Sequence, residues 1–292
     1  MRRAAQRARN LLPDPSGLTR VVDFLSSQVN DDGGFADRAG RSDLYYTVFG
    51  LEASAALGLP SPANLSNFLA QFRDIDRLDF VHATCLARCW ASLPPSDAVS
   101  QADRSRLLER IESFRTPDGG YNQWPDQPRG TAYGCILAMG TYQDLDGPPM
   151  PQPHGLLDCL RTLRADDGGY VNEPNQAAGL TPATAAAITV QIELGEPTDP
   201  RAVDWLFARH QPAGGFSAMP SLPLADLLST ATALHALARA GADIAAIRST
   251  CRRFVLGQWD NGAFRGHAFD NVRDCEYTFY GLLALGELAS DE

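Results

Sequence analysis

Five glycine turns recur along this 292-residue chain, and their spacing constrains the fold more than any other feature. Each turn places a glycine pair, or Gly-Ala in the last case, before an aromatic residue. The second glycines are Gly34, Gly120, Gly169 and Gly215, with Gly262 taking the last place, so the steps are 86, 49, 46 and 47 residues. Because the first step is nearly twice the others, one turn has been lost, and we expect six units.

Each unit combines two stretches of different character on either side of its turn. The first stretch has apolar residues at helical spacing with Arg and Asp on one side, which predicts an outer helix. These stretches cover residues 18–29, 105–114, 155–163, 201–210 and 244–256. The second stretch is apolar all round and rich in Ala, Gly and Thr, as in a closely packed inner helix. The inner stretches cover residues 43–57, 82–93, 131–145, 184–194, 226–240 and 274–288.

The fold expected from these units is all-α, with about twelve helices alternating between outer and inner positions. An open solenoid would need polar caps at both ends. The last unit instead ends on the apolar run Gly-Leu-Leu-Ala-Leu at 281–285, which favours a closed ring with unit six beside unit one. We expect an N-terminal extension over residues 1–16 and a single α/α (α6/α6) toroid or barrel domain over residues 17–292.

Composition excludes several classes of function. All 25 basic residues are arginine, so mechanisms that need a lysine, such as a Schiff base or a phosphate-binding P-loop, are excluded. The formal net charge of −10 argues against nucleic acid as a partner. The six cysteines form no Cys-x-x-Cys pair, and no apolar run has the length of a signal peptide or a membrane span. We therefore expect a cytoplasmic protein without a transmembrane segment.

The repeating units resemble those of the α/α toroid superfamily. This superfamily contains protein prenyltransferase β subunits, terpenoid cyclases and thioester-containing complement domains. The resemblance covers nearly the whole chain and is clearest at 33–38, 46–51 and 277–285, which are similar to the repeats of protein prenyltransferase β subunits. No Gly-Cys-Gly-Glu-Gln sequence is present, which disfavours the thioester branch.

In the prenyltransferases, one repeat supplies two cations and a tyrosine that hold the substrate diphosphate. The resemblance places Arg38 and Arg41 at the cation positions and Tyr46 at the tyrosine position. Arginine is a permanently charged, bidentate phosphate ligand, so Arg41 would replace the family's lysine. The structural alternative is a solvated pair of arginines beside a turn.

The same family binds zinc through an aspartate, a cysteine and a histidine. Asp43 and His82 stand at two of these positions, and Tyr45 stands where the cysteine would be. Tyrosine is a poor zinc ligand, which leaves Cys85, three residues after His82, as the candidate third ligand. The resemblance thus allows zinc at a degenerate site, and magnesium with the diphosphate. Alternatively, Asp43 and His82 are acid or base groups, or His82 is a core histidine.

The terpenoid cyclases use a buried acid to protonate an alkene or epoxide, in the motifs Asp-x-Asp-Asp or Asp-Cys-Thr-Ala-Glu. Asp274-Cys275-Glu276-Tyr277-Thr278 resembles these motifs in register, with Tyr277 in place of the second acid. Asp274 or Glu276 is then the candidate proton donor, and Tyr277 a candidate substrate contact. The structural alternative is that both carboxylates only stabilise the N-terminus of a helix.

Ring closure would bring units six, one and two together and gather these polar candidates opposite a mostly apolar wall, a layout suited to an amphiphile. We therefore expect a prenyltransferase-like enzyme, a transferase acting on an isoprenoid diphosphate. A terpene-cyclase-like enzyme and a non-catalytic isoprenoid-binding protein are the alternatives. The expected partners are an isoprenoid diphosphate or other prenyl lipid, and an α-subunit-like chain or a second copy.

Overall fold

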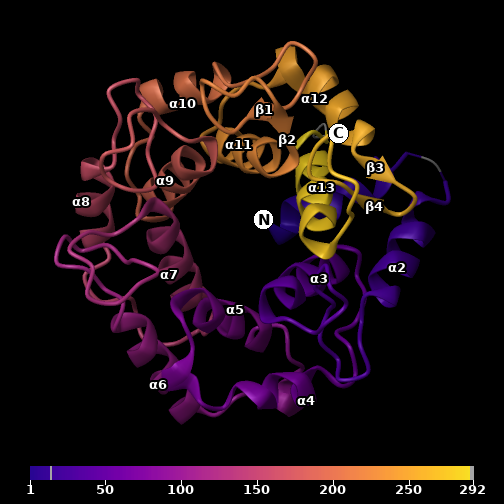
Figure 1. The fold of residues 1–292 in the computed structure, drawn as a ribbon, viewed down its shortest axis with the longest axis vertical. Coiled ribbons are helices and arrows are strands. Elements are labelled where there is room, and N and C mark those ends of the chain that lie inside the picture. Colours follow the sequence, from indigo (N-terminus) through magenta and orange to yellow (C-terminus); the bar gives the residue numbers. More distant parts are fainter. Residues whose placement is uncertain (14, 290–292) are drawn as a thin grey trace.

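Six inner helices form a closed ring, and six outer helices surround them (Figure 1). The computed structural model describes residues 1–13 and 15–289. The inner helices are α3 (Leu44–Ala56), α5 (Phe80–Trp90), α7 (Ala132–Asp144), α9 (Thr181–Glu193), α11 (Leu227–Arg239) and α13 (Cys275–Glu287). The outer helices are α2 (Gly17–Ser27), α4 (Leu65–Leu69), α6 (Gln101–Glu112), α8 (Gly155–Thr162), α10 (Pro200–Phe207) and α12 (Ala245–Gly257). Because each inner helix contacts the next and α13 contacts α3, the expected closed α/α toroid is confirmed.

In five of the six units a glycine turn connects the outer helix to the inner helix, and the turns also contact the next unit. Gly33 has a φ of 91° and Gly262 a φ of 99°, in the left-handed region that favours glycine. A Cβ atom on Gly262 would clash with the backbone of Arg20 in α2. The last turn therefore packs directly on the first outer helix, which closes the ring.

Threonines of the inner helices hold four of these turns in place. In each case the backbone N–H of the turn's aromatic residue donates to a threonine Oγ1. The pairs are Phe35 with Thr47, Tyr170 with Thr184, Phe216 with Thr230, and Phe264 with Thr278. These contacts explain why the inner stretches are rich in threonine, because a buried N–H needs an acceptor.

Several boundaries differ from the sequence expectation. Helix α6 begins at Gln101, four residues before the expected start, because the Ser100 side chain caps it by accepting the N–H of Asp103. Helix α9 begins at Thr181, three residues before the expected start, because Pro182 fits the first turn of a helix, where its missing N–H costs nothing. In unit two, which has lost its glycine turn, the outer helix α4 has only five residues. Short antiparallel pairs also occur at two turns, and they consist of β1 (Phe216–Ser217) with β2 (Ala225–Asp226) and β3 (Trp259–Asp260) with β4 (Ala263–Phe264).

The inner helices start at one end of the ring, and most start with an oxygen-bearing cap. Five N-cap side chains accept the N–H of the residue three positions later, which satisfies a donor that the helix leaves free. These caps are Asp43, Asp79, Thr131, Asp226 and Asp274. We call this end of the ring the N-terminal rim.

The first residues of the chain lie at the opposite end of the ring. Figure 1 shows the N-terminus near its centre, where α1 (Arg2–Gln6) contacts α3 and α13. Arg2 pairs with the buried Glu52 at 2.6 Å, and Arg7 of the following 3-10 turn η1 (Arg7–Asn10) pairs with the buried Glu287 at 2.9 Å. A cavity of about 940 Å³, the far-end cavity, lies here against the C-terminal ends of the inner helices.

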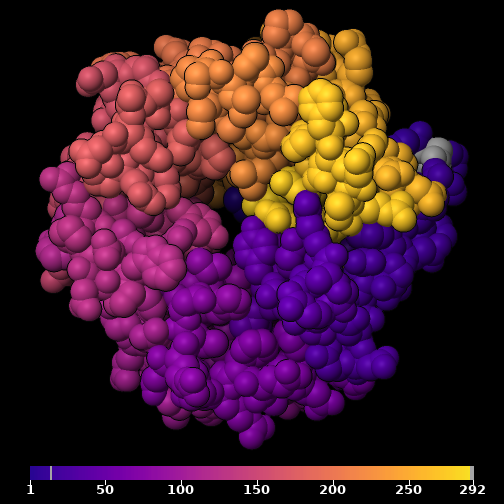
Figure 2. All heavy atoms as spheres, in the orientation of Figure 1, coloured from indigo at the N-terminus to yellow at the C-terminus, as the bar shows by residue number. Residues whose placement is uncertain are grey.

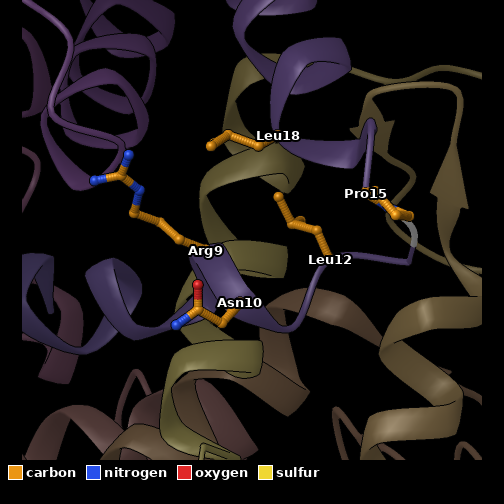
Figure 3. A pocket seen from close by; sticks show the side chains of 5 residues that line it. All are labelled: Arg9, Asn10, Leu12, Pro15 and Leu18. Atoms are coloured by element: carbon orange, nitrogen blue, oxygen red, sulfur yellow. The ribbon is translucent and has the colours of Figure 1, made fainter.

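Two further observations concern the surface. Figure 2 shows a hollow at the middle of the face that it presents, where the inner helices meet. A smaller cavity of about 370 Å³ lies between η1 and α2, with Arg9, Leu12 and Leu18 in its wall (Figure 3). In the described part of the chain, none of the helices has the length and apolar character needed to cross a bilayer.

Candidate functional site

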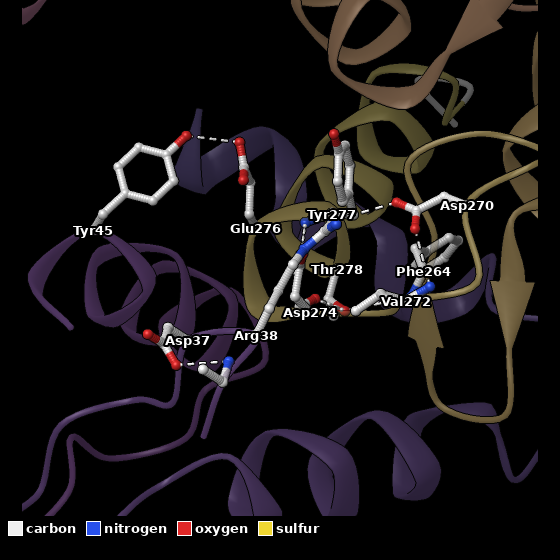
Figure 4. Close-up of polar contacts among 11 residues, drawn as sticks. Asp37, Arg38, Tyr45, Phe264, Asp270, Val272, Asp274, Glu276, Tyr277 and Thr278 are labelled. Atoms are coloured by element: carbon white, nitrogen blue, oxygen red, sulfur yellow. Dashed lines mark hydrogen bonds and ion pairs between the residues drawn. The ribbon is translucent and has the colours of Figure 1, made fainter. Parts of the chain in front are cut away.

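Arg38, on the loop that follows the first glycine turn, connects unit one to unit six. Its Nε donates to Asp274 Oδ2 at 2.8 Å, and its Nη2 donates to Asp270 Oδ2 at 3.2 Å (Figure 4). The guanidinium also lies over the Tyr277 ring, 5.6 Å from its centroid. Ring closure therefore brings Arg38 together with the acidic start of α13, as the sequence predicted, but two carboxylates neutralise its charge.

Both oxygens of Asp274 are occupied. Oδ1 accepts the backbone N–H of Tyr277 at 2.9 Å, as a helix cap does, and Oδ2 accepts from Arg38. Burial raises the pKa of Asp274, while the Tyr277 N–H and the Arg38 guanidinium oppose that shift. An aspartate that caps a helix and pairs with arginine stabilises the junction of units six and one. Each of its oxygens already accepts a hydrogen bond within the fold.

Glu276 differs from Asp274 because its one hydrogen-bond donor is neutral. The Tyr45 hydroxyl donates to Glu276 Oε1 at 2.7 Å (Figure 4). Among the described residues Glu276 has no ion-pair partner, and its side chain is half-buried. Burial raises the pKa of Glu276, and the nearby charge of Asp274 raises it further, against the effects of Tyr45 and Arg38. The environment of Glu276 therefore favours the protonated form.

A connected set of aromatic side chains begins at Tyr45, the partner of this carboxyl group. The Tyr45 and Phe49 rings lie 4.9 Å apart in an edge-to-face contact, and Phe49 lies 5.4 Å from Tyr280 and 6.0 Å from Phe279. Burial raises the pKa of the Tyr133 phenol on α7, and the charge of Glu276 adds to that shift. Helices α3, α7 and α13 thus direct aromatic groups toward one carboxyl group.

His82 forms a separate polar group at the start of α5. Its Nδ1 lies 2.7 Å from Asp79 Oδ2, and its Nε2 lies 3.9 Å from Asp43 Oδ2. The carboxylate of Asp43, and after it that of Asp79, stabilises the protonated ring and raises the pKa of His82 to about 9. His82 is therefore a cation at neutral pH, and its positive charge is paired with the carboxylates of the two helix caps, Asp43 and Asp79.

Arg41 is not brought to the cluster. It pairs with Asp37 at 3.0 Å, four residues away on the same loop, and its side chain is 80% exposed. The structure thus separates the two arginines that the sequence placed together on a diphosphate. Tyr46 lies near Arg38, and burial raises the pKa of its phenol.

The residues expected to bind zinc do not fit the ion. The Cys85 thiol is buried, and burial raises its pKa to about 12. Tyr45, which occupies the family's cysteine position, donates its hydroxyl to Glu276 instead. Over residues 1–13 and 15–289, no three His, Cys, Asp or Glu side chains are grouped so that they could hold a metal ion.

Two residues of the site, Asp79 and Asp270, were not among the sequence candidates. Tyr45 stands at the family's cysteine position and is one of the aromatic residues that could line a cavity, but its hydrogen bond to Glu276 was not predicted. Asp79 was recognisable as a cap from its place before the inner helix. Asp270 lies in an irregular loop, and no motif or period marked it.

Comparison with known proteins places these features in context. A family model described as the prenyltransferase alpha-alpha toroid domain matches residues 18–71, 74–217 and 183–290. A variant of the type II terpene cyclase MstE from Scytonema, solved with geranylgeranyl dihydroxybenzoate, is similar with a TM-score of 0.61 and 14% identity, covering 98% of this chain and 97% of that one. No curated protein sequence matches significantly.

Other solved structures are similar to a comparable degree. A protein from Actinoplanes has a TM-score of 0.61 and 17% identity, with 94% of this chain and 98% of that chain covered. A glycosidase variant has a TM-score of 0.57 and 13% identity, with the same coverage. At such low identities these similarities establish the fold, and the chemistry has to be argued from the site.

Proposed function

The chain belongs to the prenyltransferase alpha-alpha toroid domain family, and from that premise we propose that it is an isoprenoid cyclase of the type II class with Glu276 as proton donor. The observation that carries this proposal is the half-buried Glu276 carboxyl group, whose pKa is raised and which accepts a hydrogen bond from Tyr45. Tyr45 is the first ring of a connected set with Phe49 and Tyr280, which we call the aromatic wall. General acid catalysis needs a group that holds its proton at the working pH and lies beside the reacting atom.

The proposed step is protonation of the terminal alkene, or epoxide, of an isoprenoid chain. For an alkene, the O–H bond of Glu276 breaks and a C–H bond forms at the less substituted carbon, which leaves a tertiary carbocation and a glutamate. The next alkene attacks the cation and closes a ring, and loss of a proton from the last cation completes the reaction. The substrate is isomerised without any oxidant or reductant.

The aromatic wall supports this chemistry in two ways. Ring faces attract cations, with about 0.5–2 kcal/mol for each well-placed ring. They also bury hydrocarbon and keep water away from the carbocation. Tyr45, Phe49 and Tyr280 form a continuous set of ring contacts beside Glu276.

Tyr45 and Asp274 would act as positioning residues. Because the Tyr45 hydroxyl occupies Oε1, the transferable proton resides on Oε2. Asp274 holds the start of α13 through its cap and its Arg38 pair, and its negative charge disfavours ionisation of Glu276. Tyr45 would therefore orient the acid, whereas Asp274 would help to keep it protonated.

Prenyl transfer, the first expectation from the sequence, has less support at this site. Arg38 is neutralised by Asp274 and Asp270, Arg41 pairs on the exposed loop, and the zinc set does not fit. The structural similarity to a type II terpene cyclase bound to geranylgeranyl dihydroxybenzoate favours the cyclase alternative.

The purified chain should be incubated with farnesyl diphosphate, geranylgeranyl diphosphate and geranylgeranyl dihydroxybenzoate, and the products analysed by mass spectrometry. The proposal expects a cyclic product of unchanged mass with its head group intact, and none from Glu276→Gln. Release of inorganic diphosphate by ionisation of the head would contradict it.

A further inference from the structure

The inner helices contain five glycines, and four have a packing reason to be there. A Cβ atom on any of these four would clash with a neighbouring ring or backbone atom. The four are Gly50 against Phe35, Gly134 against Tyr121, Gly281 against Phe264, and Gly286 against Ala4. Gly140 on α7 is the exception, since a Cβ atom there would meet nothing within 4 Å.

Backbone conformation does not require Gly140 either. It lies inside α7, and its φ is not in the left-handed region. Glycine in a helix interior costs about 0.5–1 kcal/mol relative to alanine. Gly140 therefore destabilises its helix without relieving a clash, and it leaves open space beside α7.

The exposure pattern of α7 places the space in the centre of the ring. The half-buried residues Tyr133, Ile136, Leu137 and Gly140 recur at helical spacing and form one stripe. Because α5 and α9 pack on the flanks of α7 and α6 contacts it from the outer layer, this stripe faces the ring centre. Gly140 therefore lies on the wall of the hollow at the middle of the ring, which we call the central channel (Figure 2).

The two ends of the stripe fix how deep Gly140 lies. At the N-terminal rim, Tyr133 is close enough to Glu276 for that charge to affect its pKa. At the other end, Gln143 and Asp144 contribute to the wall of the far-end cavity. Seven residues of helix separate Tyr133 from Gly140, which is a distance of about 10 Å along the axis.

We infer that Gly140 is a specificity-determining residue, which leaves room for the part of an isoprenoid chain that lies farthest from Glu276. The inference rests on the proposed function for the identity of the ligand. Ile136 and Leu137, next to Gly140 on the stripe, make this part of the wall apolar. A long isoprenoid chain that starts at Glu276 would extend as far as Gly140. A shorter chain would end between the N-terminal rim and Gly140.

The test measures binding of geraniol, farnesol and geranylgeraniol, three uncharged alcohols that need no catalysis, to wild type, Gly140→Ala and Gly140→Phe. We expect Gly140→Phe to weaken binding of geranylgeraniol at least tenfold and that of geraniol less than twofold. Gly140→Ala should raise the melting temperature, whereas the control Gly134→Ala should lower it.

The outcomes separate this inference from the proposed function. One outcome is that wild type binds the alcohols while Gly140→Phe weakens the binding of all three equally, or of none of them. In that case the inference is wrong and the proposed function stands. If wild type binds none of them, both are contradicted. A lower melting temperature for Gly140→Ala would show that the position is packed, which also contradicts the inference.

Discussion

The hydroxyl of Tyr45 on the first inner helix donates a hydrogen bond to Oε1 of Glu276 on the last inner helix, at 2.7 Å. The contact spans the closure of the ring, where Arg38 also meets Asp274. A phenol that donates to a carboxyl group stabilises the ionised form and fixes the orientation of both oxygens. It thus connects the fold to the proposed chemistry.

Replacing Tyr45 by phenylalanine removes the only hydroxyl that donates to Glu276 among the described residues. Because that hydrogen bond lowers the pKa of Glu276, the pKa should rise in the variant. The reaction needs the protonated acid, so the descending limb of activity should move to higher pH. The rate at low pH should fall about tenfold or more, since the acid is less well oriented. A pH profile of kcat measures both effects.

Replacing Asp274 by asparagine should move the descending limb of the pH profile of kcat to lower pH. Asparagine caps a helix as well as aspartate does, so α13 should keep its start. The negative charge that disfavours ionisation of Glu276 is removed, while the positive charge of Arg38 remains. The pKa of Glu276 should therefore fall. If Asp274→Asn and Tyr45→Phe shift the limb in the same direction, Glu276 is not the titrating acid.

His82 should make folding stability depend on pH. Its pKa is raised to about 9 in the folded chain, from 6.5. The stabilisation is fully present below the lower value and is lost as the pH rises through the higher one. Because the side chain is 40% exposed, the effect should be about 1 kcal/mol or less.

Denaturant unfolding at pH 6 and pH 9.5 measures this loss. His82→Ala should remove it, whereas the control His210→Ala should keep it, because burial lowers the pKa of His210 and places its titration below this range. An unchanged pH dependence in His82→Ala would show that other groups cause it.

Closure of the ring should depend on Gly262. Its φ of 99° and its contact with the backbone of Arg20 both oppose a side chain. Gly262→Ala should cost about 1–3 kcal/mol or more, since a non-glycine residue in strained backbone adds to a clash. Gly241→Ala is the matched control, because Gly241 has a φ of 69° but a Cβ atom there would meet nothing within 4 Å. Equal unfolding free energies in the two variants would mean that the contact with α2 contributes nothing.

The repeat period predicted the ring because each glycine turn meets a physical requirement that recurs in five of the six units. A glycine of the turn needs a positive φ, as at Gly33 and Gly262, and another unit packs against it. Because these requirements repeat at the spacing of the units, the glycines that meet them appear several times in the sequence. The inner and outer stretches follow from the same regularity.

The pairing of side chains at the site could not be predicted in the same way. Arg38 and Arg41 lie three residues apart in one irregular loop, and no period indicates which of them turns toward unit six. The partner of Arg38 lies 236 residues away, and Asp270 carries no motif. Glu276 was a candidate from its register in a cyclase-like motif, but its neutral partner Tyr45 depended on ring closure.

The central claim is tested most directly by the origin of one hydrogen atom. Wild type should be incubated in deuterium oxide with the isoprenoid that it turns over, and the product examined by mass spectrometry and NMR. We expect one non-exchangeable deuterium at the carbon that is protonated first, an intact head group, and no product from Glu276→Gln. A product without deuterium, or a Glu276→Gln variant that incorporates deuterium at the wild-type rate, would contradict the assignment of Glu276 as proton donor.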